Sequence, residues 1–463
     1  MTRNLNIART GATVALIGLG AGSALAGGFA VREQSALSEG ASFAGAAANG
    51  TISSMFWNSA GVTTQNGLNT NSNITAILPT ATETALTGST FVPATGAPQS
   101  TDIGHNAYVP ASYANFQLTG YDPRMYIGIG VNSGFGLRTE PDKNWAGSNI
   151  AGSTRLFTVD FNPVLGYKFS DSIAFGIGVQ IEYAKGVFKF ATGLPGDPNG
   201  YKGPATSFEG TDLALGATAG LLYTPSPSTS IGLGWRSAIT HQLDGQFATG
   251  GSVIPAVLGG GVLNPRLNTG VASRVELRLP DIVTLSLNQA IAPSTRALGT
   301  IEWTNWSRFG GLEVISTGSG LVITQPIGLP QVLGAPNISS GQSIAKINAP
   351  WQDGWFFSGG LEYDVSKQLT VRAGGAYEIS PVTSATARLA AIPDADRIWA
   401  SLGFSYAVSQ STTLDFGYSH LFVDSAQLSQ KSPPSVFGQV ALVAGLDAEI
   451  DIFSLGLRMK LGQ

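Results

Sequence analysis

The chain of 463 residues contains no cysteine and only three histidines. The lack of cysteine excludes disulfides, thiolate metal sites and cysteine nucleophiles, although it does not by itself fix a compartment. His105, His241 and His420 are scattered along the sequence, so they form no recognisable metal-binding motif. We therefore expect neither a metal ion nor another cofactor.

Charged side chains are also scarce, at 12% of the residues, which is about half the share of an ordinary soluble protein. The 25 basic and 29 acidic residues give a net charge of -4, which offers no basic footprint for nucleic acid. An apolar content of 43% excludes a disordered chain. The 60 glycines do not recur at every third position, which excludes collagen. Few charges, many glycines and short apolar stretches together favour β-strands in a membrane.

A long apolar run is missing as well, except near the N-terminus. Arg3 and Arg9 precede an apolar stretch from Ala12 to Leu25, and this pattern predicts a secretory signal peptide that is removed after Ala26. A retained membrane helix is the weaker alternative, because the stretch is short and rich in glycine. No later segment has the roughly 18 consecutive apolar residues that a spanning helix needs. An exported, apolar chain without such a helix indicates a closed β-barrel.

Alternation of apolar and polar residues predicts the strands. In the run 173–183, Phe175 and Ile177 alternate with Gly176 and Gly178, so that one face is apolar and the other is small or polar. Runs of about ten residues suit strands that cross a bilayer at a tilt, and an even number suits a barrel with both chain ends in the periplasm. We find about fourteen such runs, near 68–82, 107–118, 124–134, 155–168, 173–185, 210–224, 229–240, 271–288, 295–306, 352–364, 368–378, 395–407, 411–423 and 448–461.

A soluble β-sandwich would also alternate, but the connections distinguish the two folds. Short connections near 119–123, 170–172, 225–228, 292–294, 365–367 and 408–410 alternate with long ones near 83–106, 135–154, 186–209, 241–270, 307–351, 379–394 and 424–447. Short periplasmic turns and long outer loops are typical of outer-membrane barrels. Placing the polar faces outward would instead put Arg296, Arg372 and Arg397 in lipid, at about 2–4 kcal/mol for each near the midplane. We therefore predict an all-β, antiparallel transmembrane barrel of about 14 strands.

The segment from Gly27 to Gly67 shows no strand alternation. It is nearly uncharged and includes Phe43, Phe56 and Trp57, whereas a floppy tail is usually polar and charged. A barrel of this size has a lumen too wide for its wall side chains to fill. We therefore predict three parts: a signal peptide at 1–26, an N-terminal hatch that plugs the lumen at 27–67, and the barrel with long extracellular loops at 68–463.

Several motifs give the mature chain a resemblance to the outer-membrane transporters of long-chain fatty acids and hydrocarbons. In the order of that family they are Gly27-Gly28-Phe29, Trp57-Asn58-Ser59-Ala60-Gly61, Gly134-Phe135-Gly136-Leu137-Arg138-Thr139 with Trp145-Ala146-Gly147, Trp303-Thr304-Asn305-Trp306-Ser307-Arg308-Phe309, and Ser380-Pro381-Val382 followed by Ile392-Pro393-Asp394-Ala395-Asp396-Arg397-Ile398-Trp399. The sequence departs from the family at Ser59, which replaces the proline of an Asn-Pro-Ala motif. It departs again at Gln463, which replaces a terminal aromatic residue.

The resemblance implies passive uptake of hydrophobic compounds across the bacterial outer membrane. A ligand would be captured on the outer loops, pass to a site near the hatch and leave sideways through the barrel wall into the membrane. In the family the start of the hatch reaches the inner site, which makes Gly27, Gly28 and Phe29 candidates for ligand binding. Asn58, Ser59 and Ala60 correspond to the hatch motif.

A carboxylate ligand would need a cation. Lys185 and Lys189 lie where the family places basic residues near the inner site, but either could be a solvated rim lysine. Lys185 breaks the alternation, so we expect it above the lipid or at a bulge. Arg236 lies on the lumen face of its strand, where pairing with Glu182 or Asp212 competes with ligand binding.

For the opening in the wall, the glycines of the third predicted strand make Gly128 and Gly130 candidates.

Three other functions fit the sequence less well. An enzyme is disfavoured because His105 and His241 fall in or beside loops, while Ser419 and His420 are neighbours on opposite faces of a strand. A general diffusion porin is disfavoured by the apolar plug. A structural or adhesive barrel stays open, although it gives no reason for a hatch. We expect a monomer whose partners are a hydrophobic ligand and membrane lipid, because no strand lacks its lipid face.

Overall fold

The computed structural model describes residues 27–89, 98–142, 145–148, 150–190, 206–249, 253–254, 261–262, 271–318, 339–431 and 441–462. The predicted signal peptide, 1–26, lies outside these residues. Among the helices of the described ranges, none is long and apolar enough to cross a membrane.

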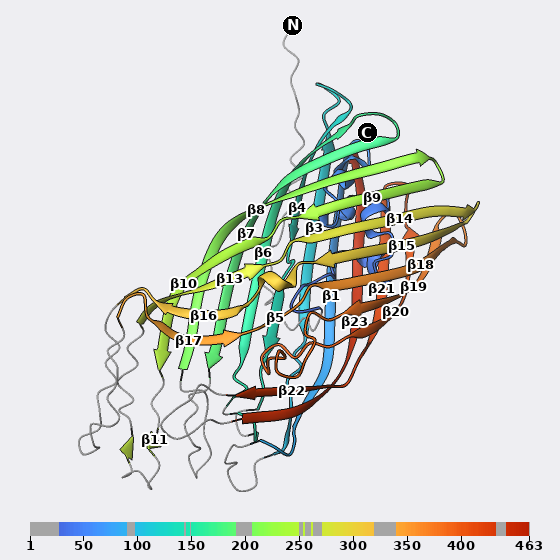
Figure 1. Ribbon diagram of the computed structural model, residues 1–463. Helices are drawn as coiled ribbons and strands as arrows, with labels where there is room; N and C mark the ends of the chain where they lie inside the picture. The colour runs from blue at the N-terminus through green and yellow to red at the C-terminus, as the bar shows by residue number, and fades with distance from the viewer. Residues whose placement is uncertain are drawn as a thin grey trace.

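Fourteen antiparallel spanning strands form a closed barrel, as the alternation predicts (Figure 1). Strand β1 pairs with β3 on one side and with β23 on the other, which closes the sheet. The spanning strands are β1 (Leu68–Ala85), β3 (Ala107–Gln117), β4 (Met125–Asn132), β6 (Thr154–Lys168), β7 (Ile173–Phe190), β8 (Thr206–Ser226), β9 with β10 (Thr229–Arg236 and Ile239–Thr249), β13 with β14 (Val271–Leu279 and Ile282–Ala292), β15 (Thr295–Thr304), β18 (Gly354–Asp364), β19 (Leu369–Ile379), β20 (Arg397–Ala407), β21 (Thr412–Val423) and β23 (Ala441–Gly462).

Short elements complete the chain. The short strands are β2 (Ser100–Asp102), β5 (Gly136–Thr139), β11 (Val253–Ile254), β12 (Gly261–Val262), β16 (Gly311–Ser316), β17 (Ser343–Asn348) and β22 (Ala426–Lys431). The helical turns are α1 (Ala36–Glu39), η1 (Ala46–Ala48), η2 (Ile52–Phe56), η3 (Ser59–Thr63) and η5 (Trp306–Arg308). All helical turns except η5 belong to the hatch, residues 27–67.

The apolar faces of the strands point outward. In β7, Ile177 exposes 62% of its surface, whereas Gln180 on the opposite face exposes 2%. In β20, Leu402 is exposed and Arg397 is buried, so the polar face lines the lumen. Side chains this apolar and this exposed need lipid around them rather than water. The predicted direction of the two faces is confirmed.

The hatch fills the lumen, and Figure 1 shows it in blue, enclosed by the strands. Nearly all of its residues up to Thr63 are buried. Glycines on the lumen face let it approach the wall closely: a Cβ at Gly234 would overlap the carbonyl oxygen of Trp57, and one at Gly220 would overlap Asn58. The hatch is therefore packed against the wall backbone and does not hang outside the barrel.

Of the runs that the sequence predicts as single strands, one ends early and two are interrupted. β4 ends before Ser133–Phe135, β9 and β10 are separated at Ser237–Ala238, and β13 and β14 are separated at Pro280–Asp281. Pro280 cannot donate a ladder hydrogen bond, which accounts for the break between β13 and β14. Between β9 and β10 the side chain of Ser237 accepts a hydrogen bond from the Ala217 amide, in place of a backbone carbonyl.

Candidate functional site

The hatch motif anchors the plug to the wall. The side-chain nitrogen of Asn58 donates to the carbonyl oxygens of Ala47 at 2.9 Å and Leu221 at 3.0 Å, and its oxygen accepts from the Ala60 amide at 3.0 Å. Ser59 donates to the Thr218 hydroxyl at 2.7 Å. Asn58, Ser59 and Ala60 are themselves buried, and these hydrogen bonds fix η3 against β8.

The first residues of the hatch form hydrogen bonds with β19 and with the connection that follows it. The Gly27 nitrogen donates to Glu378 Oε1 at 3.1 Å, and the Gly28 nitrogen donates to Asp394 Oδ2 at 2.9 Å. Gly28 has a φ of 70°, and a Cβ there would lie 2.8 Å from ring carbons of Trp306. Only glycine fits this position, because other residues are strained at such a φ and would overlap the indole.

Phe29 follows directly and lies in an aromatic cluster. Its ring centroid is 4.6 Å from that of Trp306, 5.2 Å from Phe309, 6.1 Å from Trp351 and 6.2 Å from Phe135. Such separations are typical of favourable aromatic pairs. The sequence motifs contain three of the four partners. Trp351 was missed, because it lies in a long connection without strand alternation.

A cavity of about 520 Å³ opens between the long connections and the ends of several strands, and we call it the outer cavity. Phe188, Leu312, Leu389 and Ile392 line it and belong to the same buried apolar cluster as Phe29. Three lysines also line it, Lys189, Lys346 and Lys431, of which Lys346 forms an ion pair with Glu313 at 3.2 Å. The cavity therefore joins an apolar interior to a cationic rim. Of the three predicted cations, Lys189 lines this cavity, whereas Lys185 and Arg236 do not.

The break after β4 redirects the chain inward. β4 pairs with β3 only from Ser112 onward, so the segment 107–111 of β3 has β1 as its only partner strand among the described residues. The Val31 amide donates to the Gly134 carbonyl at 2.8 Å, and the Gly136 amide donates to the Phe29 carbonyl at 3.0 Å. At Ser133–Phe135 the wall thus pairs with the hatch instead of with β3.

Gly128 and Gly130 do not form a gap in the wall. Both lie in β4 where the ladders to β3 and β6 are continuous. They also face inward, because a Cβ at Gly128 would approach Val62 and Met55 of the hatch. The glycine content of β4 therefore reflects close packing against the hatch, and the interruption lies a few residues further along the chain.

Two predicted cations are already paired. Lys185 points outward and forms an ion pair with Glu209 at 2.7 Å, in a ladder to β8 without a bulge. Of the two expected positions for Lys185, the bulge is therefore wrong, and the position above the lipid stays a prediction. Arg236 is buried and pairs with Asp160 at 2.8 Å, while its guanidinium lies 4.5 Å from the Phe56 ring centroid.

Glu182 and Asp212 do not pair with Arg236 as expected. They flank His241 instead, each at 3.1 Å from one of its ring nitrogens. His241 is fully buried in β10, so its expected position in or beside a loop is wrong. The partner of Arg236, Asp160, comes from β6, which is separated from β9 by β7 and β8. Within the described ranges no cluster of histidine and carboxylate side chains has the arrangement of a metal site.

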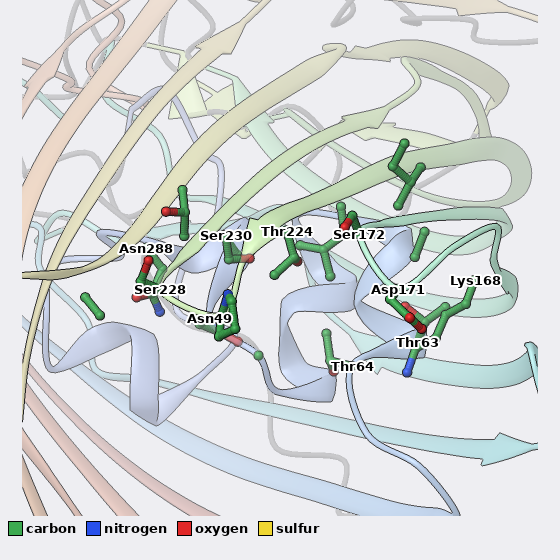
Figure 2. Close-up of a pocket in the computed structure, with 18 of the residues that line it drawn as sticks. Asn49, Thr63, Thr64, Lys168, Asp171, Ser172, Thr224, Ser228, Ser230 and Asn288 are labelled. Carbon is green, nitrogen blue, oxygen red and sulfur yellow. The ribbon is translucent and has the colours of Figure 1, made fainter. Parts of the chain in front are cut away.

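A second cavity, of about 370 Å³, lies between the hatch and the short turns. Figure 2 shows Asn49, Thr63 and Thr64 of the hatch facing Lys168, Asp171 and several hydroxyl-bearing residues of the wall. None of its lining residues belongs to the buried apolar cluster that contains Phe29.

Comparisons with known proteins agree with this geometry. A family model described as "Outer membrane protein transport protein (OMPP1/FadL/TodX)" matches residues 17–461. The "Long-chain fatty acid transport protein" of Escherichia coli O6:H1 is 27% identical over 316 residues, which cover 64% of this chain and 65% of that protein. "Outer membrane protein P1" of Haemophilus influenzae is 24% identical over 444 residues, which cover 87% of each chain.

Solved structures show the same fold. A Pseudomonas aeruginosa FadL homologue superposes with a TM-score of 0.74 at 21% identity, covering 94% of this chain and 99% of the other. The Pseudomonas putida toluene transporter TodX gives 0.63 at 14% identity, covering 93% and 99%. The family model, which matches almost the whole chain, describes outer-membrane transport proteins, so the chain is a bacterial outer-membrane transport protein and not an enzyme. The chain belongs to the OMPP1/FadL/TodX family of outer-membrane transport proteins.

Proposed function

We propose that this protein takes up hydrophobic compounds passively, by capture in the outer cavity, transfer past Phe29 and sideways release through the wall. One observation carries the proposal. A single buried apolar cluster includes Phe188 and Leu312 of the outer cavity, Phe29 at the start of the hatch and Phe135 at the break in the wall. An apolar molecule can therefore stay in contact with apolar groups along the whole route.

The composition of the outer cavity favours an amphiphile. Its isoleucine, leucine and phenylalanine side chains suit an acyl chain, which gains about 0.8 kcal/mol for each buried CH₂ group. Lys189 and Lys431 can attract a carboxylate head group, and Lys346 adds to the positive charge there although it also pairs with Glu313. This combination fits a long-chain fatty acid, as the names of several relatives suggest, better than an uncharged aromatic hydrocarbon.

Two features support release to the side: the cavity beside the short turns and the break in the wall at Ser133–Phe135. The cavity beside the short turns has charged lining residues such as Lys168 and Asp171, and none of its lining residues belongs to the apolar cluster that contains Phe29. The continuous apolar route therefore ends before this cavity. Ser133–Phe135 lies beside the Phe29 cluster, where β3 lacks a wall partner among the described residues. Movement of the hatch start would open this region, because Phe29 and Val31 both pair with it.

Uptake by a strain that lacks its own transporter of this kind tests the proposal. The triple variant Lys189→Gln, Lys346→Gln, Lys431→Gln should lower fatty-acid uptake several-fold and leave toluene uptake unchanged, because only the acid needs the cations. Lys367→Gln, in an exposed turn, is the control. Equal loss of both compounds would contradict the head-group role, and transport of neither by the unaltered protein would favour a structural barrel.

The monomeric state stays a prediction. The apolar outer face is distributed around the barrel, and lipid covers it without a partner subunit. Native mass spectrometry in mild detergent should show single chains. Trimers alone would contradict this and favour a porin-like assembly.

A further inference from the structure

The start of the hatch lies in a buried cluster of charged groups. Arg32 pairs with Glu302 at 2.8 Å and with Glu378 at 3.0 Å, and Arg397 pairs with Glu378 at 3.6 Å. Asp394 accepts a further hydrogen bond from Arg397. We call these five residues the hatch-anchor cluster, and each side chain in it is nine-tenths or more buried.

The hatch-anchor cluster is short of one positive charge. Its two arginines face three carboxylates, those of Glu302, Glu378 and Asp394. Buried carboxylates need compensation, since each uncompensated charge costs several kcal/mol. The pKa of Asp394 agrees with such a deficit, because burial raises it in spite of the attraction of Arg397.

Neighbouring charges do not supply the missing cation. Arg388 donates to the carbonyl oxygens of Val382, Asp394 and Gln427, and its charge interacts with the carboxylates of both Asp394 and Asp396. Counting Arg388 and Asp396 with the cluster gives three arginines and four carboxylates, so one positive charge is still missing. Glu33 lies near the cluster, and burial raises its pKa to about 7. Glu33 is a further acid, which supplies no positive charge and cannot relieve the deficit.

We propose that the mature amino terminus, at Gly27, is the third cation of the hatch-anchor cluster. Removal of the predicted leader after Ala26 turns the Gly27 amide into an α-ammonium group. That nitrogen already donates to Glu378 Oε1 at 3.1 Å, so the new charge forms in contact with a buried carboxylate. Leader processing thus completes the charge balance and fastens the hatch start beside the Phe29 cluster.

The local geometry restricts which residue can be first. A Cβ at Gly27 would press against Glu378, which Arg32 and Trp399 hold in place. An added residue would move the ammonium by about 3.5 Å, which is more than the length of the hydrogen bond. The inference does not depend on which compound is transported.

Chemical labelling of the native protein, purified from outer membranes, tests the proposal. Reductive methylation with formaldehyde at pH 7 modifies accessible amines, and trypsin then releases the peptide 27–32, whose mass identifies the first residue. An exposed α-amine has a pKa near 8, about two units below lysine, so it should react faster than Lys367. We expect Gly27 to react at least about tenfold more slowly than Lys367, because a buried group reacts only when its segment opens.

Glu378→Gln removes the proposed partner of the ammonium and should raise the labelling rate of Gly27 to that of an exposed amine. Glu302→Gln is the matched control, because it removes a carboxylate of the same cluster that does not contact Gly27. Labelling of unaltered Gly27 as fast as Lys367, or a different first residue, overturns the proposal. So does an equal increase in both variants, which would indicate general loosening of the hatch.

Discussion

Individual glycines on the lumen face decide how closely the hatch can approach the wall. Gly234 faces the Trp57 carbonyl so tightly that a methyl group there must displace the hatch. Alternation of side chains predicts that such glycines face inward, but it does not reveal what they contact. The contact with Trp57 joins residues far apart in the sequence, and no local pattern records it.

Gly234→Ala should therefore destabilise the folded barrel by about 1–3 kcal/mol, the usual cost of inserting a methyl group into a packed interior. Urea titration of the protein in detergent measures this change in the free energy of unfolding. Gly359→Ala is the control, because a Cβ there meets no atom within 4 Å. An equal effect at both positions would show that strand propensity matters more than contact with the hatch.

The ion pair between Arg236 and Asp160 is a second feature at the scale of residues. The sequence indicates that both face the lumen and that a buried cation needs a carboxylate. It does not indicate which carboxylate, because the barrel tilt and the path of the hatch decide which side chains meet. Glu182 and Asp212 are equally plausible by face, yet both contact His241.

Arg236→Ala should lower the free energy of unfolding by about 3–5 kcal/mol, since it leaves Asp160 buried without its partner. The double variant with Asp160→Asn should recover part of that loss. Arg278→Ala is the control, because Arg278 pairs with Glu276 on the exposed surface. Full additivity of the two substitutions in a double-mutant cycle would contradict direct coupling.

At the scale of elements, the break between β4 and β5 has the strongest bearing on transport. The sequence 124–134 alternates well enough to predict one strand, and β4 does occupy most of it. The strand leaves β3 because Gly134 and Gly136 pair with Val31 and Phe29 of the hatch. Competition between two long-range partners cannot be seen in a periodic pattern.

Gly134→Trp should reduce fatty-acid uptake several-fold without opening the lumen to ions. A Cβ at Gly134 lies 3.8 Å from the Phe56 ring, so the added indole occupies the space beside the break. Radiolabelled fatty-acid uptake and bilayer conductance together provide the measurement. With Gly359→Trp as the control, normal uptake by Gly134→Trp would exclude this break as the exit.

At the scale of the whole molecule, strand number, strand direction and closure follow from the sequence because lipid imposes them. Every backbone group must be paired inside the bilayer, and a period of two separates the lipid face from the lumen face. The outer cavity cannot be predicted from the sequence, because it forms where separate connections meet and their residues lack a common period. The hatch lies between these cases: its composition predicts burial, but its contacts come only from the three-dimensional structure.

The central claim is that the chain's own start seals the barrel, and ion conductance in planar bilayers tests it most directly. The unaltered protein should conduct very little, whereas deletion of residues 27–50 should produce an open, water-filled pore. Gly359→Ala should behave as the unaltered protein does. Conductance that is large before the deletion, or unchanged after it, would contradict the account.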